Sequence, residues 1–155
     1  MKLLPPMALV FASVLGLLGF ESPATASTKA YCHALKTAIV PSIPPVPKTG
    51  IDIAYVATVD GDMSSYMKTV RRFVSLAPSL SANTVFQKVL NDGNASIRSL
   101  NKLYTDLLYL ENHPNDSTAI AQAQSDRSTG ARPFNQLGID IKAASKISKK
   151  LCPGT

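Results

Sequence analysis

The chain has little of what enzymes and metal proteins need. Its 155 residues include no tryptophan, only two cysteines and two histidines, and only 6% aromatic residues. We interpret His33 and His113 as surface or helix-end histidines rather than as metal or haem ligands, so we expect no metal and no cofactor. The scarcity of aromatic residues, together with frequent Ala, Leu, Ser and Lys, favours helices over a β-sandwich.

Catalytic motifs are absent as well. The chain contains no Gly-x-Ser-x-Gly nucleophile elbow and no Gly-rich phosphate loop. Asp60-Gly61-Asp62 resembles the start of a calcium loop, but the twelfth position is Arg71 where the loop requires Glu. We therefore expect a protein that is not an enzyme.

The first 26 residues have the features of a signal peptide. Lys2 supplies a positive charge, an apolar run follows, and Ala24-Thr25-Ala26 matches a cleavage site. The run is too short and too interrupted for a comfortable transmembrane helix, although an uncleaved N-terminal anchor is the alternative. We expect residues 27–155 to form a single domain without a transmembrane segment, secreted to the cell envelope or the extracellular space.

The two cysteines lie near the two ends of this mature chain. Cys32 follows the signal and Cys152 is close to the C-terminus. In an oxidising compartment an even number of cysteines is expected to pair. The sequence therefore predicts a Cys32–Cys152 disulfide that closes almost the whole domain into one loop.

Apolar residues at helical spacing predict four helical segments. The first covers about 28–40, with Cys32, Leu35 and Ile39 on its apolar stripe, and a proline-rich connector follows at 41–50. The second covers about 52–77, with Asp52 as its N-cap. Residues 51–59 alone are also compatible with a strand, but the continuing periodicity favours a helix.

Two longer segments follow. Apolar residues keep an unbroken helical spacing through residues 81–112, but Asn91-Asp92-Gly93 in the middle is a turn signal. The segment is therefore either two helices or one long helix, and the unbroken spacing favours one. Its stripe includes Tyr104 and Leu108. Residues 117–151 form the fourth segment, with Asn115 or Asp116 as N-cap and a stripe that starts at Ile120. Gly130 and Pro133 are expected to break or kink it.

Four amphipathic segments with short connectors predict an all-α, four-helix-type bundle. Packing the first and last segments side by side brings the two thiols within the distance a disulfide needs. We expect one disulfide to join the first and last helices of a monomer.

Three short motifs resemble a group of small secreted helical proteins of actinobacteria, most of them of unassigned function. They are Tyr31-Cys32-His33-Ala34-Leu35-Lys36, Leu76-Ala77-Pro78-Ser79-Leu80 and Leu151-Cys152-Pro153. The resemblance spans the mature chain. It implies the same disulfide-closed bundle and a bacterial envelope or extracellular location, and it implies no catalytic residues.

Basic residues are the best functional lead in this chain of net charge +6. Two groups of basic residues each lie on one face of a predicted helix. The first group, in the fourth segment, is Lys142, Lys146, Lys149 and Lys150, and the second group, in the second segment, is Lys68, Arg71 and Arg72. Such faces bind an anionic polymer or lipid headgroups, although a solvated helix face has the same pattern. No aromatic residues interleave with the lysines, so nucleic acid is not expected. The alternative function is a carrier of a small apolar ligand, lipid or haem, in the bundle core.

Overall fold

The structure of the protein is a computed structural model. It describes residues 23–38 and 50–154. These residues form four helices and no strand: α1 (Pro23–Thr37), α2 (Ile53–Leu76), α3 (Leu80–Asn112) and α4 (Ser117–Leu151). Residues 1–22 of the predicted signal and residues 41–49 of the predicted connector lie outside the described residues. No described helix is both long and apolar enough to cross a bilayer.

Local capping explains where the three long helices start. The Asp52 carboxylate accepts the Tyr55 backbone N–H at 2.7 Å, and the Ser79 hydroxyl oxygen accepts that of Ala82 at 3.2 Å. Asp116 accepts the N–H groups of Thr118 and Ala119 at 3.0 Å each. These side chains satisfy N–H groups that have no partner within the helix. The predicted caps Asp52 and Asp116 are confirmed.

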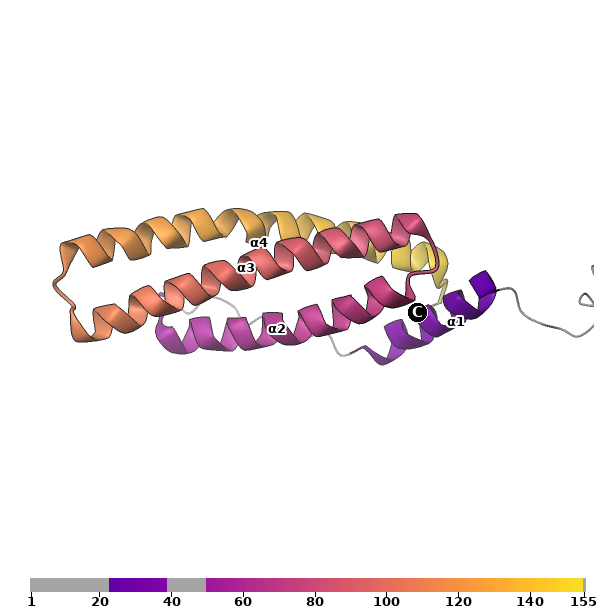
Figure 1. Cartoon of the computed structure of the whole chain (residues 1–155), viewed down its shortest axis with the longest axis horizontal. Helices are drawn as coiled ribbons and strands as arrows, with labels where there is room; N and C mark the ends of the chain where they lie inside the picture. Colours follow the sequence, from indigo (N-terminus) through magenta and orange to yellow (C-terminus); the bar gives the residue numbers. More distant parts are fainter. Residues whose placement is uncertain (1–22, 39–49, 155) are drawn as a thin grey trace, which may run out of the picture.

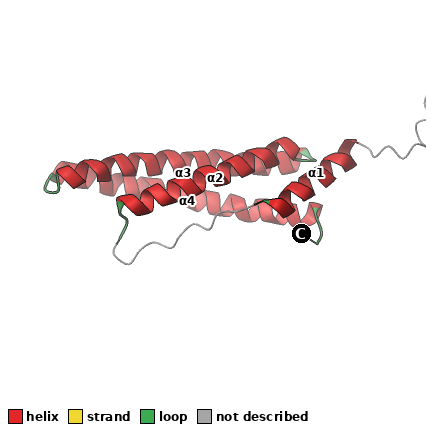
Figure 2. Cartoon of the chain, turned by 90° about the horizontal axis from the view of Figure 1, so that it is seen from below, coloured by secondary structure: helices red, strands yellow, loops and turns green. Residues whose placement is uncertain are grey.

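The three long helices lie side by side, and α3 runs antiparallel to both α2 and α4 (Figures 1 and 2). The short α1 packs at one end of them. α3 contacts both α2 and α4, whereas α2 and α4 have no close backbone contact with each other among the described residues. α1 contacts α2 and α4. The all-α fold with four helices agrees with the prediction, and α1 joins the two outer helices only at the end that carries the C-terminus.

Apolar side chains from all four helices form one core. Its largest fully buried members include Tyr31, Met63 and Met67. Sixteen buried residues make up this core: Tyr31, Ala34, Val56, Val59, Met63, Met67, Val70, Phe73, Phe86, Val89, Leu100, Leu103, Ala123, Leu137, Ala144 and Cys152. Burial of this apolar surface is the main force that holds the helices together.

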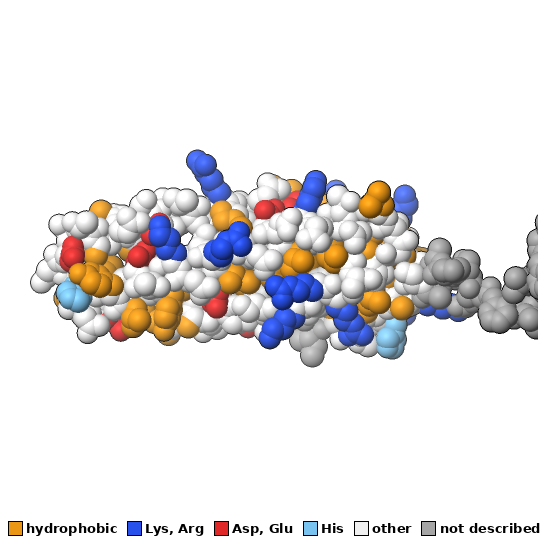
Figure 3. Space-filling model, viewed as in Figure 1, with side chains coloured by type: hydrophobic (Ala, Val, Ile, Leu, Met, Phe, Trp, Pro, Cys, Tyr) orange, Lys and Arg blue, Asp and Glu red, His pale blue; other side chains and the backbone are white. Residues whose placement is uncertain are grey.

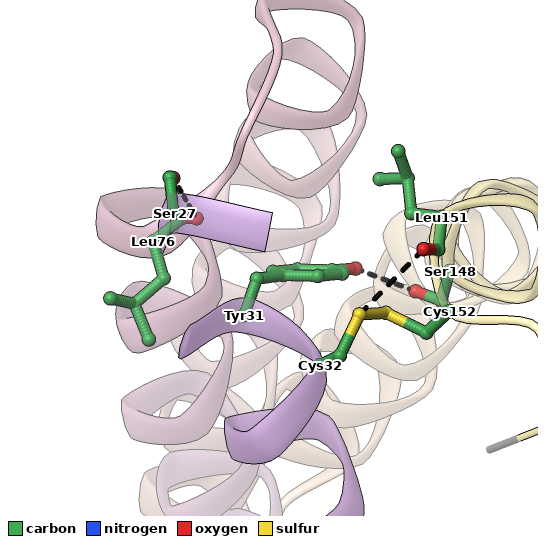
Figure 4. The surroundings of a disulfide bond; sticks show 7 residues. All are labelled: Ser27, Tyr31, Cys32, Leu76, Ser148, Leu151 and Cys152. Atoms are coloured by element: carbon green, nitrogen blue, oxygen red, sulfur yellow. Dashed lines mark hydrogen bonds between the residues drawn. A yellow bond between two sulfur atoms is a disulfide. The ribbon is translucent and has the colours of Figure 1, made fainter. Parts of the chain in front are cut away.

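The predicted disulfide is present and joins α1 to the end of α4 (Figure 4). The Cα atoms of Cys32 and Cys152 are 5.6 Å apart, across 120 residues of sequence. Beside the disulfide, the Tyr31 hydroxyl and the Ser148 hydroxyl are hydrogen-bonded at 2.7 Å. Burial raises the pKa of Tyr31, an effect that the bond to Ser148 partly offsets. A covalent bond and a buried hydrogen bond therefore fix α1 to α4.

Residues 80–112 form one helix that passes through Gly93 without a break, as the favoured prediction had it. The reason that glycine is tolerated lies in α2. A Cβ atom at position 93 would lie 2.0 Å from Sδ of the buried Met67. Gly93 thus leaves room on α3 for the Met67 side chain of α2. The strand alternative for residues 51–59 is wrong, because Ile53 already begins α2.

The predicted break in the fourth segment is absent. α4 runs unbroken from Ser117 to Leu151 with Pro133 inside it. Proline removes one backbone hydrogen bond, but buried neighbours on both sides, Gly130 and Leu137, keep this stretch packed on the bundle. Gly130 is buried because α4 approaches α3 closely there, and an added Cβ would lie 3.1 Å from Cβ of Ser99.

Several positions of the predicted stripes need correction. On α1 the predicted Cys32 and Leu35 are half-buried and pack against the core, but the fully buried residues are Tyr31 and Ala34, which were not predicted. Ile39 lies outside the described residues. On α3 and α4, Tyr104, Leu108 and Ile120 are exposed at 36%, 45% and 37%. A stripe read from sequence is wider than the face that the neighbouring helices cover.

Candidate functional site

Charge is unevenly distributed along the length of the bundle. The antiparallel register places residues 27–38, 64–96 and 136–154 at the end that carries the disulfide, and residues 50–63 and 97–135 at the other end. We call these the basic half and the distal half. Figure 3 shows Lys and Arg side chains along the visible face, including the end nearest α1, acidic side chains in the middle and in the distal half, and His side chains at both ends.

The basic half contains ten Lys and Arg residues, all exposed, and two carboxyl side chains, Asp92 and Asp140. The ten are Lys29, Lys36, Lys68, Arg71, Arg72, Lys88, Lys142, Lys146, Lys149 and Lys150. In the distal half the balance is reversed, with four basic residues, Arg98, Lys102, Arg127 and Arg132, against seven carboxyl side chains. The described chain therefore has a strong electric asymmetry along its long axis.

Both predicted basic groups lie in this half. The four lysines of α4 are exposed, and Ile141, Ala144 and Leu151 between them are buried or half-buried. Lys68, Arg71 and Arg72 are exposed on α2. The two groups lie on helices that have no close backbone contact with each other, and α1 contacts both helices. The fold thus brings them to the same end of the molecule.

Three further basic residues were missed by sequence reasoning: Lys29 and Lys36 of α1, and Lys88 of α3. The spacing of Lys29 and Lys36, two helical turns apart, was a usable signal for a common face. Their membership of the basic half depends on the docking of α1 beside α4, which the disulfide prediction implied. Placing Lys88 in the basic half required knowledge of the register of α2 against α3.

A surface depression of about 500 Å³ lies in the basic half, between α1, α2 and α4. The buried rings of Phe73 and Phe86, 5.4 Å apart, contribute to its wall. Leu35, Tyr66, Ile141 and Ala144 complete its apolar lining, and its polar lining consists of Lys36, Ser145, Ser148 and Lys149. No described carboxylate lines it. Burial raises the pKa of the Tyr66 phenol above its ordinary value.

A second depression, of about 330 Å³, lies in the distal half, where α1 does not reach. Its wall is also mainly apolar, with Val56, Leu103 and Phe134 among its residues. Its polar lining differs, because the Asp126 carboxylate takes part together with Arg127. The two depressions thus differ in charge: described cations alone border the first, and both signs border the second.

Two carboxyl pairs bridge α3 and α4. Asp92 faces Asp140, and Asp106 faces Asp126, each pair within hydrogen-bonding reach. The pairs are spaced by fourteen residues on both helices, 92 to 106 and 126 to 140, as an antiparallel helix pair in constant register requires. Asp126 and Asp140 are only 9% and 8% exposed. Two carboxyl groups can form a hydrogen bond only when one of them keeps its proton.

The surroundings indicate where each proton resides. Burial, followed by the bond to Asp126, raises the pKa of Asp106, whose Oδ2 atom is buried without a donor. Lys102 donates to the Asp126 carboxylate at 2.6 Å and Gln122 donates at 2.8 Å, and these bonds lower the pKa of Asp126. Asp106 is thus the member of this pair that binds a proton more readily.

In the other pair, burial and the facing Asp140 raise the pKa of Asp92, and the charge of Lys88 partly offsets the rise. Gln136 donates to Asp140 at 3.3 Å. Sequence reasoning missed all four aspartates, although each follows an apolar stripe residue by three positions. These residues are Val89, Leu103, Ala123 and Leu137.

The structure groups no metal ligands among its described residues, since no cluster of three or more His, Cys, Asp or Glu side chains is present there. His33 is exposed on α1 in the basic half, whereas His113 follows the end of α3 in the distal half and stacks on Tyr109 with ring centres 4.1 Å apart.

Comparison with known protein families, with curated proteins and with solved structures found no match for this chain.

Proposed function

We propose that this protein is a secreted, non-catalytic binding protein that attaches to an anionic membrane surface through its basic half. The observation that carries the proposal is the segregation of charge: ten exposed Lys and Arg residues at one end, against two carboxyl groups that face each other between α3 and α4.

Electrostatic attraction explains how such a surface works. Each Lys or Arg near an anionic bilayer contributes roughly 1 kcal/mol, and the attraction decays within a Debye length of about 10 Å at 0.1 M salt. The net negative distal half should be repelled from the same bilayer, so the molecule is expected to approach with the disulfide end first. The orientation follows from charge alone, without a specific headgroup contact.

Co-sedimentation with vesicles tests the proposal. The protein should sediment with vesicles that contain phosphatidylglycerol and stay in solution with pure phosphatidylcholine. Because the attraction is screened, bound protein should be released as salt rises from about 0.05 M to about 0.5 M. Equal binding to both vesicles, or binding only to a soluble anionic polymer such as polyphosphate, would reject the membrane as the target.

The second candidate function is a carrier of a small apolar ligand. The observation that favours it is the apolar lining of the depression in the basic half, about 500 Å³ in volume, which lies within the usual range of roughly 300–1,000 Å³ for ligand pockets. The interior between the helices is filled by side chains such as Met63 and Met67, so the ligand would bind at the surface. Affinity for an uncharged apolar ligand should hardly change with salt, which separates the two functions.

A further inference from the structure

We propose that the depression between α1, α2 and α4 binds one acyl chain of an anionic lipid, with the headgroup held between Lys36 and Lys149. This inference rests on the proposed function and names the ligand of the same basic half. The depression lies where the cationic surface meets half-buried apolar side chains, and an anionic lipid presents both chemistries.

The lining separates into an apolar part and a charged part. Leu35, Tyr66 and Ile141 are half-buried, whereas Phe73, Phe86 and Ala144 are only 4% exposed, so the apolar surface that an acyl chain would cover belongs mainly to the first three. Lys36 of α1 and Lys149 of α4 are exposed and line the same depression. An apolar chain with one anionic end satisfies both parts at once, whereas a purely polar anion or an uncharged hydrocarbon satisfies only one.

Charge also distinguishes this depression from the depression of about 330 Å³ in the distal half. That depression is apolar too, but Asp126 lines it together with Arg127. A carboxylate repels an anionic headgroup, and burying that headgroup next to it adds a desolvation cost. We therefore assign the acyl chain to the basic-half depression, of about 500 Å³, rather than to the depression that Asp126 lines.

The disulfide contributes directly to this site. Leu35 and Lys36 follow Cys32 on α1, and Ser148 and Lys149 precede Cys152. The Cys32–Cys152 bond and the Tyr31–Ser148 hydrogen bond thus hold together the two walls that carry the two lysines. A site built by a covalent bond between two helices is preorganised, so little ordering is needed on binding.

Fatty acids of increasing length are the probe, measured by isothermal titration below their critical micelle concentrations with the disulfide-bonded protein. Octanoate, decanoate and dodecanoate should bind with one-to-one stoichiometry, and each added CH₂ should tighten binding up to about fourfold while the chain fits the depression. Decanol, which lacks the charge, should bind at least about fivefold more weakly than decanoate.

Two tryptophan substitutions on α4 give a matched comparison. Ser145 lines the proposed site and Ala131 lines the distal depression, and both are exposed, so neither change disturbs the core. Ser145→Trp should block the site and weaken decanoate binding at least tenfold, whereas Ala131→Trp should leave it unchanged. Lys36→Gln together with Lys149→Gln should also weaken binding by on the order of tenfold, with an unchanged circular dichroism spectrum.

The outcomes separate this inference from the proposed function. Vesicle binding without one-to-one decanoate binding, or decanoate binding that Ser145→Trp does not weaken, overturns the acyl-chain site and leaves the surface function standing. Decanoate binding without vesicle binding supports the site and rejects the surface function. Failure of both measurements overturns both.

Discussion

Asp92 of α3 and Asp140 of α4 face each other across the helix pair, and burial followed by the hydrogen bond to Asp140 raises the pKa of Asp92. Asp106 and Asp126 repeat the arrangement fourteen residues further along α3. In each pair, packing of α3 on α4 raises the pKa of the α3 aspartate, so that carboxyl binds a proton more readily in the folded protein. The stability of the helix pair is therefore linked to pH.

The direction of that linkage follows from the two sets of shifts. The pKa values of Asp92 and Asp106 rise above 3.8 on folding, so their stabilising contribution is complete below that pH and is lost as pH rises through the raised values. Asp116 and Asp126 have lowered pKa values, so their contribution is present above 3.8 and is lost at lower pH. The bundle should be most stable in mildly acidic solution.

Replacing Asp92 and Asp106 by Asn should remove the loss of stability at higher pH, because an amide supplies the donor without needing a proton. We expect the double variant to melt about 2–4 °C above the original protein at pH 7.5 and to show little difference near pH 4. Thermal unfolding followed by circular dichroism checks this. Asp62→Asn, on α2 and outside both pairs, is the control; an equal effect of that change would contradict the role of the pairs.

Gly93→Ala should destabilise the protein although alanine favours helices. A Cβ at position 93 would lie 2.0 Å from Sδ of Met67, which is 1% exposed, so the methionine must move within a packed core. Such overpacking costs about 1–3 kcal/mol. Gly138→Ala meets no atom within 4 Å, so it should instead stabilise by about 0.5–1 kcal/mol. Urea unfolding of the two variants should give opposite signs; the same sign for both would refute this account.

Removal of the disulfide should release α1 before the rest of the bundle. On the loop-entropy account, a bridge across 120 residues contributes about 4–5 kcal/mol. Among the described helices, the backbone of α1 lies close to α2 and α4 alone, at one end, although the Tyr31 ring also contacts Phe86 of α3. In a Cys32→Ala, Cys152→Ala variant, hydrogen exchange should accelerate in residues 27–37 more than in α3. Uniform acceleration in all helices would show instead that α1 is not a separately stable element.

Tyr31→Phe tests the second connection between α1 and α4. The change leaves the ring packing against Phe73 and Phe86 in place but removes the partner of the buried Ser148 hydroxyl at 2.7 Å. An unsatisfied buried polar group costs about 1–3 kcal/mol. Tyr104→Phe, at an exposed position, should cost almost nothing. Chemical denaturation of both variants measures the difference, and equal stability would indicate that the Tyr31 bond contributes nothing.

Features that depend on local chemistry were predictable from the sequence. Asp52 and Asp116 cap their helices through their own side chains, so the starts of α2 and α4 could be placed within a residue. The Cys32–Cys152 bond followed from there being only two cysteines. In contrast, Gly130 and Pro133 were expected to break or kink α4, and no break occurs. Their local cost is visible in the sequence, whereas the packing of α4 on α3 is not.

The candidate site depended on tertiary register. The lysines of α4 were identifiable from their spacing, but their grouping with Lys36 and Lys88 required the positions of α1 and α3. The four paired aspartates were missed because a search for apolar stripes passes over charged residues. Asp126 lies at the stripe position between Ala123 and Gly130, where the sequence alone gives no reason to expect a partner.

The measurement that tests the central claim most directly compares two triple variants of equal net charge on phosphatidylglycerol vesicles. Lys142, Lys146 and Lys150 become Gln in the first, and Arg98, Arg127 and Arg132 become Gln in the second; all six side chains are exposed. If the basic half binds the membrane, the first variant should lose about 10- to 100-fold in affinity and the second at most about twofold. Equal losses, or no loss in the first variant, would contradict the proposal.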